Sequence, residues 1–64
     1  MTPYQQGREE FTAYMIRFTP ETARAIIDDY EQIINRYKRR GDTLIDPAWE
    51  AEYIRGARDA TATA

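Results

Sequence analysis

The sequence predicts an all-α protein of three helices, and two observations carry the prediction. Each of the three prolines directly follows a helix-capping residue, in the pairs Thr2-Pro3, Thr19-Pro20 and Asp46-Pro47. Proline is tolerated at the first helical position, and a preceding Thr or Asp accepts a hydrogen bond from a free backbone N–H. Each pair also opens a segment whose apolar residues recur at helical spacing. We therefore expect helices over about residues 3–18, 20–40 and 47–59.

The first helix has one apolar stripe, with residues at intervals of three, four and seven: Tyr4, Phe11, Tyr14, Met15 and Phe18. Gly7 lies within this helix and costs roughly 1 kcal/mol relative to alanine, so we expect fraying there or a close neighbour. Ile16 falls off the stripe. It either widens the buried face or is exposed to a partner.

The central helix has the widest stripe, which repeats at seven-residue intervals: Ala23, Ile26, Ile27, Tyr30, Ile33, Ile34 and Tyr37. A stripe of this width is typical of a globular bundle face rather than of the narrow seam of a coiled coil. Isoleucine is a mediocre helix former, so packing must hold this helix. Gly41 provides a stop directly after its basic end.

Part of the central stripe has no obvious partner within the chain. At about 1.5 Å per residue this helix is on the order of 30 Å long, more than either other helix covers alone. The Thr19-Pro20 corner also limits antiparallel overlap with the first helix. We therefore expect a bundle or hairpin completed by homodimerisation. The expected self-association residues are Ile26, Ile27, Tyr30, Ile33, Ile34 and Tyr37.

Residues 41–46 form the predicted loop before the third helix, and we expect Leu44 and Ile45 to tuck under the bundle. The third helix places four residues on one face, namely Trp49, Tyr53, Ala57 and Ala60. Gly56 and Ala57 leave room for a close helix approach. Residues 1–60 are expected to form one domain, and residues 61–64 a disordered tail.

The composition argues against most catalytic and metal chemistry. The 64-residue chain has no cysteine and no histidine, so disulfides, the usual zinc ligands and imidazole acid–base catalysis are absent. It also has no serine, and a core this small cannot readily enclose a pocket. We expect no enzyme and no cofactor. A marginal core of this size needs support, which points to oligomerisation or a partner.

Mean hydropathy is −0.78, 31% of the residues are charged, and no apolar run approaches the roughly 20 residues of a membrane span. No basic-then-apolar signal pattern opens the chain. We expect a cytoplasmic protein that does not contact membranes.

Charge alternates in blocks along a chain whose net charge is only −2. The basic cluster consists of Arg36, Lys38, Arg39 and Arg40. Complementing the dipole at a helix C-terminus explains it better than phosphate binding does, because nucleic-acid readers usually have a larger basic excess. The acidic residues that follow lack the spacing of a calcium loop and are better explained by charge complementarity and solubility: Asp42, Asp46, Glu50 and Glu52.

Aromatic residues supply the remaining interface candidates, because tyrosine and tryptophan are enriched at binding hot spots. They are Trp49, Tyr53, Tyr30 and Tyr37, of which at least half are expected in the core. Our leading hypothesis is a non-enzymatic regulatory or accessory protein, of the type made by bacteriophages and mobile elements, that binds a host or cellular protein as a helical homodimer. The alternative is a nucleic-acid-associated regulator, in which Arg55 and Arg58 join the basic cluster in a dimer. A third possibility is a structural subunit of a larger assembly.

Overall fold

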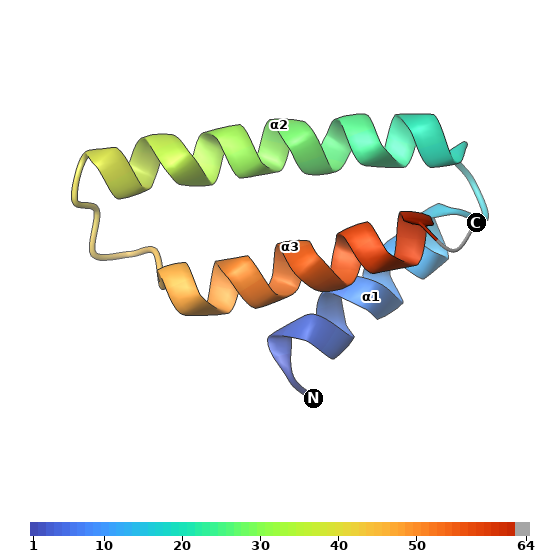
Figure 1. Ribbon diagram of the computed structural model, residues 1–64, viewed down its shortest axis with the longest axis horizontal. Helices are drawn as coiled ribbons and strands as arrows, with labels where there is room; N and C mark the ends of the chain where they lie inside the picture. Colours follow the sequence, from blue (N-terminus) through green and yellow to red (C-terminus); the bar gives the residue numbers. More distant parts are fainter. Residues whose placement is uncertain (63–64) are drawn as a thin grey trace.

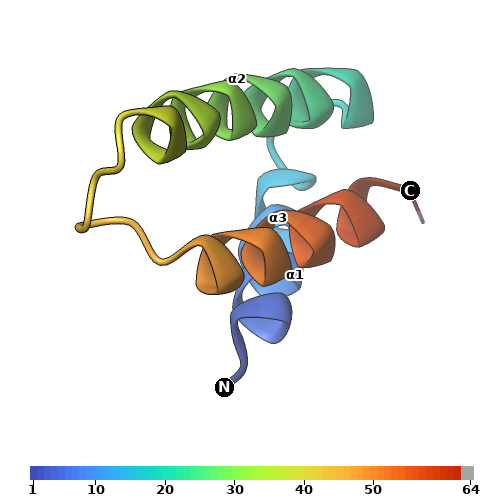
Figure 2. The same ribbon diagram turned by 60° about the vertical axis from the view of Figure 1, so that its left-hand side comes forward.

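Three helices form the fold, and the computed structural model describes residues 1–62. They are α1 (Pro3–Tyr14), α2 (Pro20–Arg39) and α3 (Pro47–Ala62), which confirms the all-α prediction. Figure 1 shows α2 and α3 running side by side in opposite directions, while α1 crosses α3 obliquely, as the turned view in Figure 2 also shows. None of the helices within residues 1–62 is both long and apolar enough to cross a membrane.

The predicted caps open all three helices. Thr2 and Gln5 form a reciprocal capping box, in which each side chain accepts the other residue's backbone N–H at 3.1 and 3.0 Å. The Thr19 hydroxyl accepts the N–H of Thr22 at 3.2 Å. The Asp46 carboxylate accepts two backbone N–H groups of the first turn of α3, at 3.1 and 3.2 Å.

Two glycines allow α1 and α3 to touch backbone to backbone. A Cβ atom built on Gly7 would lie 2.1 Å from the carbonyl oxygen of Tyr53, and one built on Gly56 would lie 2.0 Å from that of Tyr4. No real side chain tolerates these distances. Of the two outcomes expected at Gly7, fraying or a close neighbour, the structure shows the close neighbour, and Gly56 supplies the matching space on α3.

The core lies where all three helices meet. Its buried members come from α1, α2 and α3 together: Phe11, Ala23, Ile27, Ile54, Ala57 and Ala60. Met15, Tyr30 and Tyr53 pack against this cluster from its edge and are half-buried. Because α3 contributes half of the buried residues, it serves as the common support on which the other two helices pack.

The first helix is shorter than predicted. It ends at Tyr14 rather than Phe18, and the following residues form a tight turn in which the N–H of Ile16 donates to Ala13 at 3.2 Å. Thr19 is extended, as expected for a residue that precedes proline, and it separates this turn from α2. The central helix ends at Arg39 with Gly41 at φ 69°, as the predicted stop requires.

The loop prediction is wrong for Leu44, which is 90% exposed, whereas Ile45 is half-buried. The carboxylate of Asp42 accepts the backbone N–H of Leu44 at 2.9 Å, so a local turn sets the direction of this segment. An apolar side chain at a loop tip was assigned to the core from its residue type alone.

The third helix is longer than predicted and runs to Ala62. Thr61, expected in a disordered tail, is only 2% exposed. Its hydroxyl donates to the carbonyl oxygen of Arg58 at 2.9 Å, and its own carbonyl accepts from the Arg24 side chain at 3.3 Å. The tail prediction is therefore wrong for residues 61 and 62, and residues 63 and 64 lie outside the described part of the chain.

Candidate interaction surface

The apolar stripe of α2 divides into two rows with different surroundings. The inner row of Ala23, Ile27 and Ile34 is buried against the rest of the chain. The outer row remains in contact with solvent, with exposed fractions of 38% for Ile26, 44% for Ile33 and 37% for Tyr37. The stripe is therefore wider than the surface that the rest of the chain covers. Its inner row is buried, and its outer row remains accessible.

Aromatic side chains connect this outer row to the end of α1. Tyr30 follows the same helical spacing as the outer row, and its ring centroid lies 5.7 Å from that of Tyr53. Tyr53 lies 6.4 Å from Phe11, which contacts Tyr14 edge-on at 4.9 Å. Tyr14 in turn lies 6.1 Å from Phe18, and both are exposed. Because this series passes through the buried Phe11, the exposed residues form two groups, one at and just after the end of α1 and one on α2. Together we call them the apolar face, consisting of Tyr14, Phe18, Ile26, Ile33 and Tyr37.

Two tyrosine–carboxylate hydrogen bonds hold the centre of the surface together. The Tyr30 hydroxyl donates to Glu50, and the Tyr53 hydroxyl donates to Glu10. Partial burial raises the pKa of both tyrosines above the ordinary value, and the neighbouring carboxylates raise it further. These bonds join α2 to α3 and α3 to α1, so the rings that support the apolar face are fixed in position.

The predicted self-association residues therefore separate into two groups. Ile27 and Ile34 belong to the interior of the single chain, so they are not available to a second copy. Ile26, Ile33 and Tyr37 are exposed, and Tyr30 is half-buried beside them. The sequence did not separate these rows, because all six residues fall within one helical stripe.

Two aromatic interface candidates, Trp49 and Tyr53, lie on α3 and are not among the exposed residues of the apolar face. Trp49 stacks on Tyr53 at 5.2 Å with an interplanar angle of 13°, and both are half-buried. Sequence reasoning did not include Tyr14 or Phe18 among the interface candidates. Of its two alternatives for Ile16, a wider buried face or exposure, the structure shows exposure, at 85%. The position of Ile16 off the stripe was the available signal that its side chain avoids the core.

The basic cluster is exposed on the last turns of α2 and forms no ion pair within residues 1–62. Arg55 and Arg58, which the alternative hypothesis added to it, are engaged elsewhere. Arg55 pairs with Glu52 at 2.9 Å. Arg58 bridges to α2 through Asp28 at 3.0 Å and Glu31 at 2.9 Å. Their charges are compensated within the chain, which weakens the nucleic-acid hypothesis.

The acidic residues around the loop have structural partners. Asp42 and Asp46 accept backbone N–H groups, Glu50 accepts from Tyr30, and Glu52 pairs with Arg55. In the part of the chain that the structure describes, no three carboxylates gather into a group that suits a metal ion. Capping and ion pairing therefore account for this acidic set.

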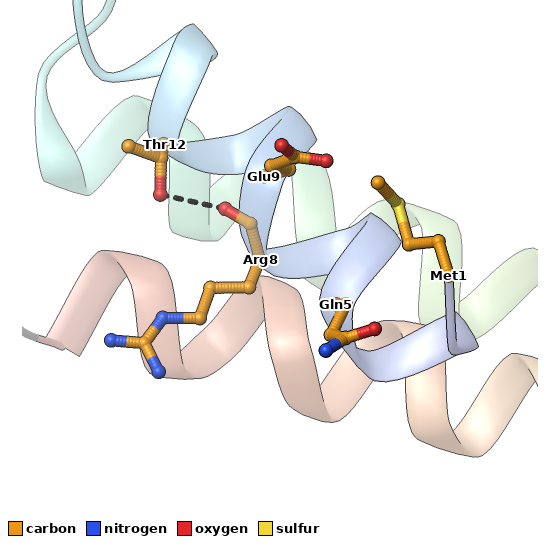
Figure 3. Close-up of a pocket in the computed structure, with 5 residues that line it drawn as sticks. All are labelled: Met1, Gln5, Arg8, Glu9 and Thr12. Atoms are coloured by element: carbon orange, nitrogen blue, oxygen red, sulfur yellow. Dashed lines mark hydrogen bonds between the residues drawn. The ribbon is translucent and has the colours of Figure 1, made fainter.

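The surface of residues 1–62 includes two open hollows. Figure 3 shows the first, of about 480 Å³, whose lining comes from Met1 and one face of α1, where the Thr12 hydroxyl donates to the Arg8 carbonyl. A single helix face cannot surround a ligand, so this hollow offers no enclosed site. The second, of about 560 Å³, is lined by residues 13–18, including Tyr14, Ile16 and Phe18. It adjoins the apolar face and extends it around the corner between α1 and α2.

Comparison with protein families, with curated proteins and with solved structures finds no match for this chain. A functional assignment must therefore follow from the chemistry of its surface.

Proposed function

We propose that this protein is a non-enzymatic regulatory or accessory protein that acts through protein–protein interaction as a helical homodimer. The observation that carries the proposal is the apolar face, whose five large side chains lie on a small, highly charged chain. Groups of exposed apolar side chains are typical of interaction sites, whereas isolated exposed residues are ordinary.

The shape of the molecule supports the same proposal. Its Cα atoms span 35 × 24 × 15 Å, so the fold is little more than one helix thick in its shortest direction. A flat fold of three helices cannot cover both flanks of its longest helix. A second copy on the outer flank of α2 would bury the surface that the chain leaves open, and would add the apolar burial that a chain of this length needs.

Neighbouring isoleucines provide the test. Ile33 is 44% exposed and Ile34 only 4%, so the same substitution probes the surface at one residue and the core at the next. Ile33→Asp should retain the far-ultraviolet circular dichroism of the parent and sediment as a monomer at concentrations where the parent dimerises. Ile34→Asp should unfold the chain, because an unpaired buried carboxylate is strongly disfavoured. A folded Ile33→Asp variant with unchanged association would refute the assignment of this surface.

A nucleic-acid-associated regulator is the second candidate, favoured by the four exposed cations of the basic cluster. It predicts binding to duplex DNA that weakens steeply with salt and disappears when Arg39 and Arg40 are both changed to alanine. The absence of such binding at low salt would remove this candidate and leave the protein-interaction proposal unaffected.

A further inference from the structure

The charge pattern on the outer flank of α2 distinguishes a second copy of this chain from a foreign protein as the partner that covers it. We propose that a second copy of this chain covers the outer row of α2, with the two α2 helices antiparallel and Asp29 of each copy beside Arg36 of the other. This inference rests on the proposed homodimer and adds its geometry. The experiments below separate an error in the geometry from an error in the proposed function.

The spacing of the outer row fits a helix–helix seam. Ile26, Tyr30, Ile33 and Tyr37 follow one another at intervals of four, three and four residues, as the two core positions of a heptad do. A two-fold axis between Tyr30 and Ile33 would place Tyr30 of one copy against Ile33 of the other. It would also place Ile26 against Tyr37. Each layer then combines one isoleucine with one tyrosine, which keeps the seam even in width.

The residues on the two sides of this seam differ in exposure. Ile27 and Ile34 border it on the side that faces α3, where they are buried. Asp29 and Arg36 border it on the other side, seven residues apart and exposed. Neither side chain forms a hydrogen bond or ion pair in the described residues 1–62. Residues at this heptad position lie opposite one another in an antiparallel pair, so both Asp29–Arg36 contacts form by symmetry.

The charge distribution along α2 selects the antiparallel orientation. Acidic residues, including Glu21 and Asp29, occupy its first half, and the basic cluster occupies its last turns. An antiparallel pair brings the acidic half of one copy beside the basic end of the other. A parallel pair would bring the two basic clusters side by side, and like charges in such proximity oppose association. A foreign partner would need no such two-fold complementarity in this helix.

Charge exchange tests the pairing. Asp29→Arg and Arg36→Asp should each weaken dimerisation by about tenfold, because each variant converts two attractive contacts per dimer into repulsive ones. The double variant D29R/R36D should regain the parent's dissociation constant. Arg39→Asp is the matched control, since the same charge change falls on the face of α2 away from the seam; it should weaken dimerisation less than Arg36→Asp does. Single variants that dimerise like the parent, or a double variant that stays weak, would overturn the pairing.

Spin-label distances test the orientation directly, because a chain without cysteine accepts one introduced label. Ala25, Gln32 and Arg39 are exposed and lie at seven-residue intervals on one face of α2. In an antiparallel dimer, labels at Gln32 lie almost level, whereas those at Ala25 or Arg39 are offset by about 20 Å along the axis. The label distance should therefore be shortest at Gln32. Equal distances at all three positions, in a dimer, would indicate a parallel pair and overturn the inference alone.

A chain that stays monomeric in all of these samples would overturn the homodimer itself, and with it this inference. Dimers that persist in Ile33→Asp would show that another surface mediates association.

Discussion

Replacing Gly7 with alanine should destabilise the fold by about 2 kcal/mol, although alanine is the better helix former. Intrinsic propensity alone favours the variant by roughly 1 kcal/mol. Against this, the new Cβ would lie 2.1 Å from the carbonyl oxygen of Tyr53 and 3.2 Å from the backbone nitrogen of Ala57. An ordinary contact of this kind begins at 3.4 Å, and neither obstacle is a flexible side chain. The two helices must therefore separate by about 1 Å, and this gap weakens the van der Waals contacts around the buried Phe11.

Overpacking of this kind costs about 1–3 kcal/mol, and a clash between two backbones belongs at the upper end. A net loss of about 2 kcal/mol is large for a chain whose total stability is of the order of 3–10 kcal/mol. With a urea dependence of about 1 kcal/mol per molar, the midpoint should fall by about 2 M. Urea titrations followed by the fluorescence of Trp49, the single tryptophan, measure this shift.

Gly41→Ala is the matched control, because a Cβ at Gly41 meets no atom within 4 Å. Its cost comes only from the positive φ of 69° and should be about 1 kcal/mol. A Gly7→Ala variant that is as stable as the parent, or more stable, would refute the backbone contact between α1 and α3.

Three further predictions follow from the same packing. Ile27→Ala should cost about 2–5 kcal/mol and Ile26→Ala less than about 1 kcal/mol, measured by urea denaturation at concentrations low enough to keep the chain monomeric. Because folding raises the pKa of Tyr30 and Tyr53, the folded chain binds their protons more tightly than the unfolded chain does. The free energy of unfolding should therefore be retained below pH 10 and fall as the pH rises above it. In urea titrations at alkaline pH, Tyr30→Phe should reduce this fall. Arg58→Ala should change the urea midpoint by less than about 1 M, because its ion pairs are largely exposed, and an unfolded variant would contradict that assignment.

The number of helices and all three of their starts were predictable from sequence, because Thr2, Thr19 and Asp46 act locally through capping hydrogen bonds. Helix ends were less predictable, since they depend on distant contacts. Thr61 joins α3 because its carbonyl meets Arg24, which is 37 residues away. Nothing in an alanine- and threonine-rich terminus reveals that contact.

The candidate surface was only partly predictable for a related reason. Periodicity correctly placed Ile26, Ile27, Ile33 and Ile34 on one side of α2, but it could not say which flank α3 would cover. That choice depends on tertiary packing. The close approach at Gly7 and Gly56 positions α3 against α1, while Ile27 and Ile34 are the isoleucines of α2 that are buried. Gly7 was expected either to fray its helix or to need a close neighbour, and Gly56 to permit a close approach, yet no sequence rule paired them.

Sedimentation equilibrium of the unmodified protein, with circular dichroism over the same concentration series, tests the central claim most directly. The claim is that the apolar face is a self-association surface. We expect a reversible monomer–dimer equilibrium in which the melting temperature rises with protein concentration, because only folded chains associate into the dimer. A monomer that stays fully helical, melts cooperatively at a constant temperature and shows no dimer at any concentration would contradict it.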